Sequence, residues 1–186
     1  MKKKSLALVL ALAMIVVCVV GGTLAWLIDK TDPVKNTFTT SDIDITLAET
    51  TGTSYQMIPG YTIAKDPKVT VLADSEKCYL FVKVAESDNF DTFMTYEMAA
   101  GWTQGDGTNI PSNVYYRVVD TADMGTAYSV LANDQVTVKD TVTKAMLNGL
   151  TEATQPTLTF TAYACQYNNS NGTNFSAIEA WNNVTT

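Results

Sequence analysis

The sequence predicts an all-β protein, an antiparallel jelly-roll β-sandwich with a few short helices. Three observations favour this fold class. Period-two runs rich in β-branched and aromatic residues recur along the chain after Asp29, a pattern typical of half-buried strands. Clusters of Gly, Pro, Asn and Asp separate these runs at short intervals. Because strands do not alternate with helices and no internal repeat occurs, we expect antiparallel sheets packed face to face.

Six segments carry the strand pattern, and we expect roughly eight strands in all. In chain order these segments are 42–49, 68–73, 78–86, 114–120, 135–143 and 157–166. In the third of them, Leu80 and Val82 alternate with Tyr79 and Phe81. The aromatic side chains of that strand are therefore expected on the opposite face from the aliphatic ones.

Helical patterns are few and short. Residues 141–152 can form a turn or two before Gly149, and 174–184 spaces apolar residues at i, i+3 and i+6. Residues 88–100 fit either a helix or a loop. Turn-forming residues gather at four places, namely 58–61, 66–68, 105–109 and 168–174.

The first 25 residues have the layout of a secretory signal peptide. Lysines at 2–4 precede an uncharged run over 5–28, and Thr-Leu-Ala at 23–25 places small residues where a signal peptidase reads them. We therefore expect cleavage after Ala25, which leaves Trp26 at the start of the mature chain. The alternative is a membrane anchor, because 24 uncharged residues can cross a bilayer core of about 30 Å. The glycine pair before the small-x-small site favours cleavage.

Charge and composition exclude several classes of function. The chain of 186 residues has 12 basic and 19 acidic residues and a formal net charge of −7. Without the three lysines at 2–4, 9 basic residues remain against 19 acidic ones, a net charge of −10. A protein with this acidic charge repels nucleic acid and anionic lipid. Histidine is absent, which excludes Ser–His–Asp and Cys–His catalysis and removes the commonest zinc ligand. We expect no catalytic residue, metal site or cofactor.

Two cysteines remain after the signal peptide, Cys78 and Cys165. In an exported protein such a pair can form a disulfide. The alternative is two separate buried thiols, since the sequence does not place the two Cα atoms within bridging distance.

Three stretches carry a family resemblance. Residues 21–47 join Gly-Gly-Thr, an aromatic residue near the cut, Asn-x-Phe and a strand of alternating Asp and Ile. Residues 57–84 place a Pro-Gly turn before a strand and a Val-Lys-Val strand, and 155–166 is followed by AIEAW at 177–181. On these motifs the chain resembles the TasA/camelysin family. Those secreted bacterial proteins form biofilm matrix fibres, and the signal peptidase SipW cleaves their signals.

The resemblance implies a jelly-roll sandwich that is secreted and assembles outside a Gram-positive cell. Family members polymerise by donor-strand complementation, in which the freed N-terminal strand of one subunit completes the sheet of the next. The implied parts are a signal peptide at 1–25, an extended candidate donor strand at 26–40 and a β-sandwich domain at 41–186. The implied partners are other copies, a SipW-like signal peptidase and an accessory matrix protein. The membrane is a partner only before cleavage.

The candidate donor strand offers apolar side chains that can fill pockets of a neighbouring subunit: Trp26, Leu27, Ile28, Val34 and Phe38. A sandwich that lacks an edge strand exposes unpaired backbone groups, and an extended segment can satisfy them. Pro33 lies within this stretch. Because proline removes one ladder donor, pairing there must be interrupted or bulged.

Two other functions remain open at this point. The camelysin name implies an exported metallopeptidase, for which the sequence shows no ligand spacing. A monomeric surface adhesin or binding module can also use a β-sandwich, because a fold does not determine a function.

Overall fold

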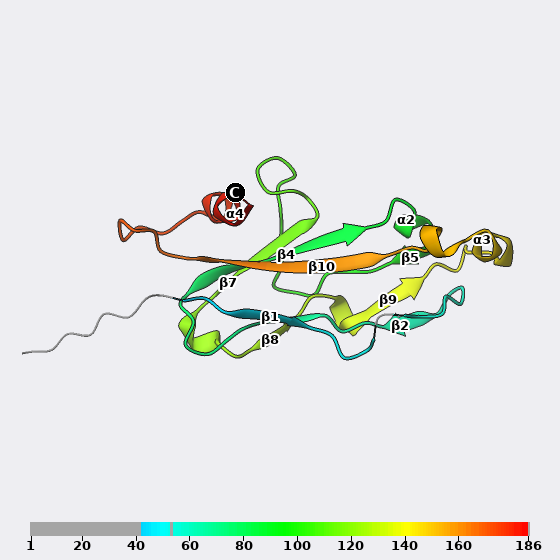
Figure 1. Cartoon of the computed structure of the whole chain (residues 1–186), viewed down its shortest axis with the longest axis horizontal. Coiled ribbons are helices and arrows are strands. Elements are labelled where there is room, and N and C mark those ends of the chain that lie inside the picture. Colours follow the sequence, from blue (N-terminus) through cyan, green and yellow to red (C-terminus); the bar gives the residue numbers. More distant parts are fainter. Residues whose placement is uncertain (1–41, 53, 186) are drawn as a thin grey trace, which may run out of the picture. The chain divides into compact units, whose positions relative to one another are not determined.

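A computed structural model describes residues 42–52 and 54–185 (Figure 1). The predicted signal peptide at 1–25 and the whole of the predicted extended segment at 26–40 lie outside the described residues. The described part is mostly β, with ten strands in antiparallel sheets and a few short helices. The all-β prediction is therefore confirmed. No helix among the described residues is long and apolar enough to cross a membrane.

The first layer is a four-stranded antiparallel sheet of order β10-β4-β7-β6. The strands are β10 at Leu158–Gln166, β4 at Cys78–Glu86, β7 at Val114–Val119 and β6 at Thr103–Gln104. β10 and β4 pair without a break from Leu158 opposite Glu86 to Gln166 opposite Cys78. This register fixes which side chains share a face along both strands.

The second layer contains two three-stranded sheets, of orders β1-β3-β8 and β2-β9-β5. Their strands are β1 at Ile45–Ala48, β2 at Thr62–Ala64, β3 at Lys68–Val71, β5 at Met94–Thr95, β8 at Ala127–Ser129 and β9 at Gln135–Val138. Two backbone hydrogen bonds join the sheets, from Val130 N–H to Pro67 O at 2.9 Å and from Lys65 N–H to Asp134 O at 2.8 Å. Pro67, which has no N–H to donate, lies at the junction of β2 and β3.

The main core lies between the two layers. Val69, Leu80, Val82 and Val119 are fully buried there. As the sequence pattern predicts, the even-numbered residues of β4 point into this core, whereas its aromatic residues belong to a cluster on the other face of the sheet. A further cluster around Leu131 continues the core past β9.

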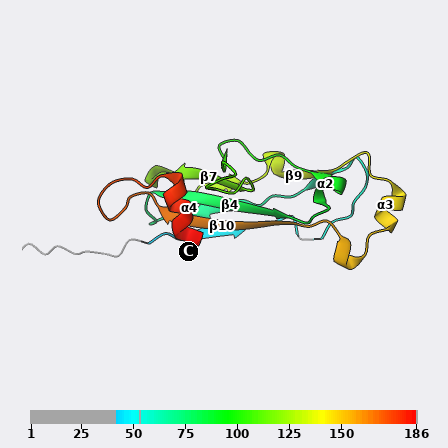
Figure 2. The ribbon, with the colours of Figure 1, turned by 90° about the horizontal axis from the view of Figure 1, so that it is seen from above.

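The outer face of the first sheet is covered by α4 (Ala177–Thr185), drawn in red in Figures 1 and 2. Trp181 is 6% exposed and its ring lies 5.3 Å from that of Phe81 and 5.5 Å from that of Tyr163. Ser176 and Glu179 form a capping box at the start of the helix: Ser176 N–H donates to the Glu179 carboxylate at 2.8 Å, and Glu179 N–H donates to Ser176 Oγ at 3.3 Å. The helix predicted at 174–184 is confirmed.

The remaining helices are short. They are α2 at Phe90–Phe93, α3 at Lys144–Asn148, and three 3₁₀ helices, η1 at Thr121–Asp123, η2 at Ala132–Asp134 and η3 at Glu152–Thr154. The ambiguous stretch 88–100 contains α2 followed directly by β5.

The predicted turn at 105–109 is organised by one carboxylate. Asp106 Oδ1 accepts backbone N–H groups of Thr108 at 2.9 Å, Asn109 at 2.7 Å and Ile110 at 3.0 Å. The Asn109 side chain and these amides hold the pKa of Asp106 well below its usual range. Gly105 packs against the return of the loop so closely that a Cβ there would lie 2.3 Å from a backbone oxygen.

Candidate functional site

Half of the backbone N–H and C=O groups of β10 point away from β4, the strand with which it pairs. Ser87 N–H donates to Thr157 O at 3.0 Å and Tyr167 N–H donates to Lys77 O at 2.9 Å. In the unbroken antiparallel register these are hydrogen-bonded pairs, so the odd-numbered residues of β10 bond to β4. The even-numbered residues therefore direct their N–H and C=O groups to the other edge. Their side chains point into the core, and they are Leu158, Phe160, Ala162 and Ala164.

The first strand of the second layer has the same arrangement. Leu72 N–H donates to Asp44 O at 2.8 Å, so the even-numbered residues of β1 bond to β3. Ile45 packs on the core, and its backbone faces the opposite edge. Across residues 42–52 and 54–185, neither the outer edge of β1 nor that of β10 pairs with another strand. β1 and β10 approach each other along this side, but no backbone pairing joins them among the described residues. We call this unpaired side the open side of the sandwich.

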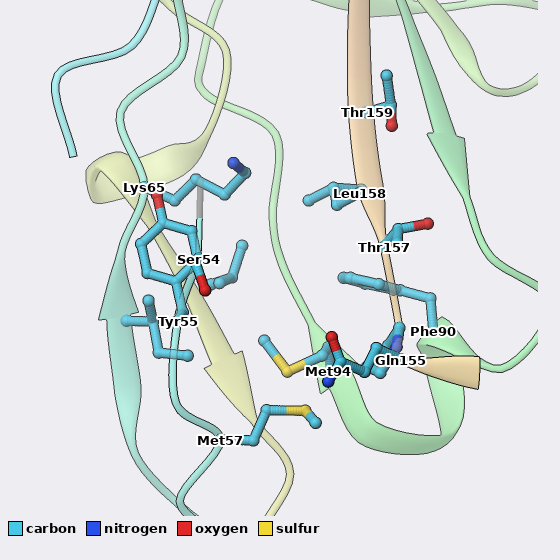
Figure 3. Close-up of a pocket in the computed structure, with 13 residues that line it drawn as sticks. Ser54, Tyr55, Met57, Lys65, Phe90, Met94, Gln155, Thr157, Leu158 and Thr159 are labelled. Carbon is cyan, nitrogen blue, oxygen red and sulfur yellow. The ribbon is translucent and has the colours of Figure 1, made fainter. Parts of the chain in front are cut away.

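Two cavities lie along the open side, and we call them together the edge groove. The larger, of about 380 Å³, has a lining of mixed polarity. Its apolar surface includes Tyr55, Met57, Phe90, Met94 and Leu158, and its polar groups come from Ser54, Lys65, Gln155, Thr157 and Thr159. Figure 3 shows Tyr55 and Lys65 on one side of this cavity and Leu158 and Thr159 of β10 on the other, with Phe90 and Met94 at one end. The smaller, of about 310 Å³, lies between residues 47–49 and residues 158–160.

An ion pair lies at the point that the two cavities share. Lys65, which lines both, donates to Glu49 Oε1 at 2.9 Å and to Oε2 at 3.0 Å. The two side chains are 12% and 21% exposed. The Lys65 ammonium also lies 5.4 Å from the ring centre of Tyr55 and 5.8 Å from that of Phe160. The edge groove thus combines apolar and aromatic side chains with one mostly buried pair of opposite charges.

The wall of the groove opposite β10 is held by hydrogen bonds. Tyr55 donates its hydroxyl to Glu49 at 2.8 Å, and burial raises the pKa of this phenol. Asp66 accepts the hydroxyl of Thr50 at 2.7 Å and backbone N–H groups of Thr50 and Thr51 at 2.9 and 3.0 Å. The Thr50 hydroxyl, followed by the backbone amide of Thr50, holds the pKa of Asp66 well below its usual range. These bonds keep the groove preformed.

The predicted cleavage site at Ala25 and Trp26 lies outside the described residues. So do the predicted donor-strand residues Trp26, Leu27, Ile28, Val34 and Phe38.

The structure places Cys78 and Cys165 on neighbouring strands, where both are buried and free. Cys78 points into the main core and Cys165 toward α4, on opposite faces of the sheet. In this structure they are two separate buried thiols, which is the alternative to a disulfide. Burial raises the pKa of Cys78 to about 11 and also raises that of Cys165.

No group of three or more Cys, Asp or Glu side chains within the described ranges is arranged to hold a metal ion. The residues that line the edge groove were not identified from the sequence. Lys65 and Glu49 lie 16 residues apart and Phe160 much later in the chain, so their meeting depends on strand order. No family model, curated protein or solved structure matches the chain.

Proposed function

We propose that this chain is a secreted structural protein whose copies assemble into extracellular biofilm matrix fibres. The N-terminal extended segment of one copy, residues 26–40, adds to the edge groove of the next. The observation that carries this proposal is the open side of the sandwich, where a nine-residue strand leaves one backbone edge unpaired within the described part. Unpaired edges of this kind bind an extended chain through backbone hydrogen bonds, while pockets accept alternate side chains.

The sheet orders support a jelly roll that lacks one strand. With β2 and β3 taken as one long strand, and β8 and β9 as another, the first layer contains β10-β4-β7 and the second contains β2/β3-β9/β8-β5. In a jelly roll the first strand of the chain lies beside the last strand. Here β1 pairs with β3 instead, which leaves the place beside β10 open to a strand from another copy.

In this proposal, assembly begins only after export and cleavage of the signal peptide. A SipW-like signal peptidase cleaves after Ala25, and the segment that begins at Trp26 is then free of the membrane. Before that cut, the N-terminal end of the segment is continuous with the apolar run 5–28 and is held at the bilayer. An accessory matrix protein is a further proposed partner, with a role at the fibre end or at the cell surface.

The experiment compares the chain that begins at Trp26 with one that begins at Thr39. Both are purified as monomers in mild denaturant, diluted into buffer, and followed by electron microscopy and analytical sizing. The longer chain is expected to form fibres and the shorter one to remain monomeric. A synthetic peptide of residues 26–40 added in excess is expected to shorten the fibres, because it occupies edge grooves without offering a new one. Equal assembly by both chains, or by neither, would refute the proposal.

A further inference from the structure

The extended segment has a two-sided pattern of its own. Read at period two, its even-numbered positions hold all its large apolar side chains except Leu27, namely Trp26, Ile28, Val34 and Phe38. The even-numbered positions also hold two charged residues, Lys30 and Asp32. Pro33 falls among the odd-numbered positions. In an extended strand these two sets point to opposite faces.

We propose that this segment, donated by a second copy, lies antiparallel to β10 with its even-numbered side chains in the edge groove. This inference rests on the proposed function and adds the direction and the inward face of the added strand. β10 is the acceptor because it offers nine residues of free edge against the four of β1. Both cavities are also lined by Leu158 and Thr159 of β10.

The direction follows from the backbone of β10. Its free N–H and C=O groups belong to residues whose side chains point inward. In an antiparallel pair, directly opposite residues exchange both hydrogen bonds and share a face. The inward residues of an antiparallel donor therefore make the bonds. In a parallel pair, each residue of β10 would bond to the two neighbours of the donor residue opposite it. The outward residues of a parallel donor would therefore make the hydrogen bonds.

Pro33 distinguishes these two arrangements. With the even-numbered side chains inward and the strand antiparallel, Pro33 points outward and its nitrogen faces away from β10. The missing N–H then costs no ladder hydrogen bond, as for prolines on the solvent side of an edge strand. With the same face inward in a parallel strand, the proline would remove a bond from the centre of the pairing.

Charge complementarity also favours the even-numbered face. Inward-pointing Lys30 and Asp32 would be costly in a wholly apolar groove. The edge groove instead holds Lys65 and Glu49 between its two cavities, each less than a quarter exposed. Lys30 of the donor can approach Glu49, and Asp32 can approach Lys65. The apolar donor residues on either side of this charged pair then enter the two cavities.

The face is tested by a matched pair of proline substitutions at adjacent polar positions. In chains that begin at Trp26, Asn36→Pro removes an N–H on the inward, hydrogen-bonded side, and Thr37→Pro removes one on the outward side. We expect Thr37→Pro to assemble within about threefold of the parent rate and Asn36→Pro to lose about tenfold or more. The reverse ranking, an equal loss, or no loss in either variant would overturn the assignment.

The direction is tested by disulfide trapping between two copies. Single cysteines replace outward donor residues (Asp29, Thr31, Lys35 or Thr37) in one chain. In the other chain they replace Thr159 or Thr161 of β10, or Thr157 directly before it. Outward antiparallel pairs are the non-hydrogen-bonded ones, with Cα atoms about 4.5 Å apart, which suits a disulfide. The buried Cys78 and Cys165 stay in place, and the parent chain is the control for background cross-linking.

An antiparallel strand requires that moving the donor cysteine forward by two residues moves the best acceptor back by two. A shift in the same direction, or fibres without any cross-link to β10, would overturn the inference while leaving assembly intact. If the parent chain that begins at Trp26 forms no fibres, the proposed function itself fails. The two failures are therefore distinguishable.

Discussion

The attachment of α4 gives the sharpest prediction about stability. Trp181 is 6% exposed and contacts the rings of Phe81 and Tyr163. Truncation to alanine removes most of a side chain that buries about 150–250 Å². Measured Trp→Ala substitutions in cores cost about 3–5 kcal/mol, and two ring contacts place Trp181→Ala in the upper part of that range. With a urea m-value of about 2 kcal/mol per M, the unfolding midpoint should fall by roughly 2 M.

The assay is urea unfolding followed by far-ultraviolet circular dichroism, because removal of a tryptophan alters the fluorescence signal itself. Ile178→Ala is the control on the same helix. Its side chain is 37% exposed, and we expect it to lower the free energy of unfolding by no more than about 1 kcal/mol. A cost below about 1 kcal/mol for Trp181→Ala, or the same cost for both variants, would refute the packing of α4 described here.

Three further predictions concern other parts of the sandwich. Cys78 and Cys165, with raised pKa values and buried positions, should resist thiol reagents at pH 8 until the protein is unfolded; rapid labelling of the folded chain would contradict this. The lowered pKa of Asp106 stabilises the fold above the unfolded-state pKa, and this contribution is lost as pH falls from about 5 to 2. The melting temperature of the Asp106→Asn variant should therefore fall less over that range than that of the parent chain. The same pH profile for both chains would contradict this role of Asp106. Gly105→Ala would place a Cβ 2.3 Å from Pro111 O and should cost about 1–3 kcal/mol, measured by thermal unfolding; an unchanged melting temperature would show that the loop gives way freely.

Long strands and their faces could be predicted from the sequence because the evidence is local. The run 78–86 forms β4 with the same bounds, and 157–166 forms β10 one residue shorter. The shortest strands could not be predicted, since the two residues of β5 or of β6 hold no period-two pattern. Their place in a sheet depends on backbone partners that lie far away in the chain.

The edge groove could not be predicted for a related reason. Alternation along 157–166 shows that one face of the strand is apolar, but the same pattern suits a central strand and an edge strand. Only the sheet order places β10 at an edge. The turn predicted at 66–68 also has a role that its sequence does not show. The hydrogen bonds made by Lys65 N–H and Pro67 O join the two sheets of the second layer. That junction positions Lys65 opposite β10.

The edges of the sandwich differ in a way that favours a partner for β10. β5 and β6 have two residues each, and β1 has four, and very short edge strands are one way in which proteins avoid unwanted pairing. β10 has nine residues, LTFTAYACQ, with no charge and no proline, and its pairing with β4 contains no bulge. A strand with none of these protections would promote aggregation in a protein that remained monomeric. The cavities beside it combine apolar side chains with the Lys65–Glu49 pair. The donor strand that we propose would meet all three features at once, because it offers backbone groups, apolar side chains and one charge of each sign.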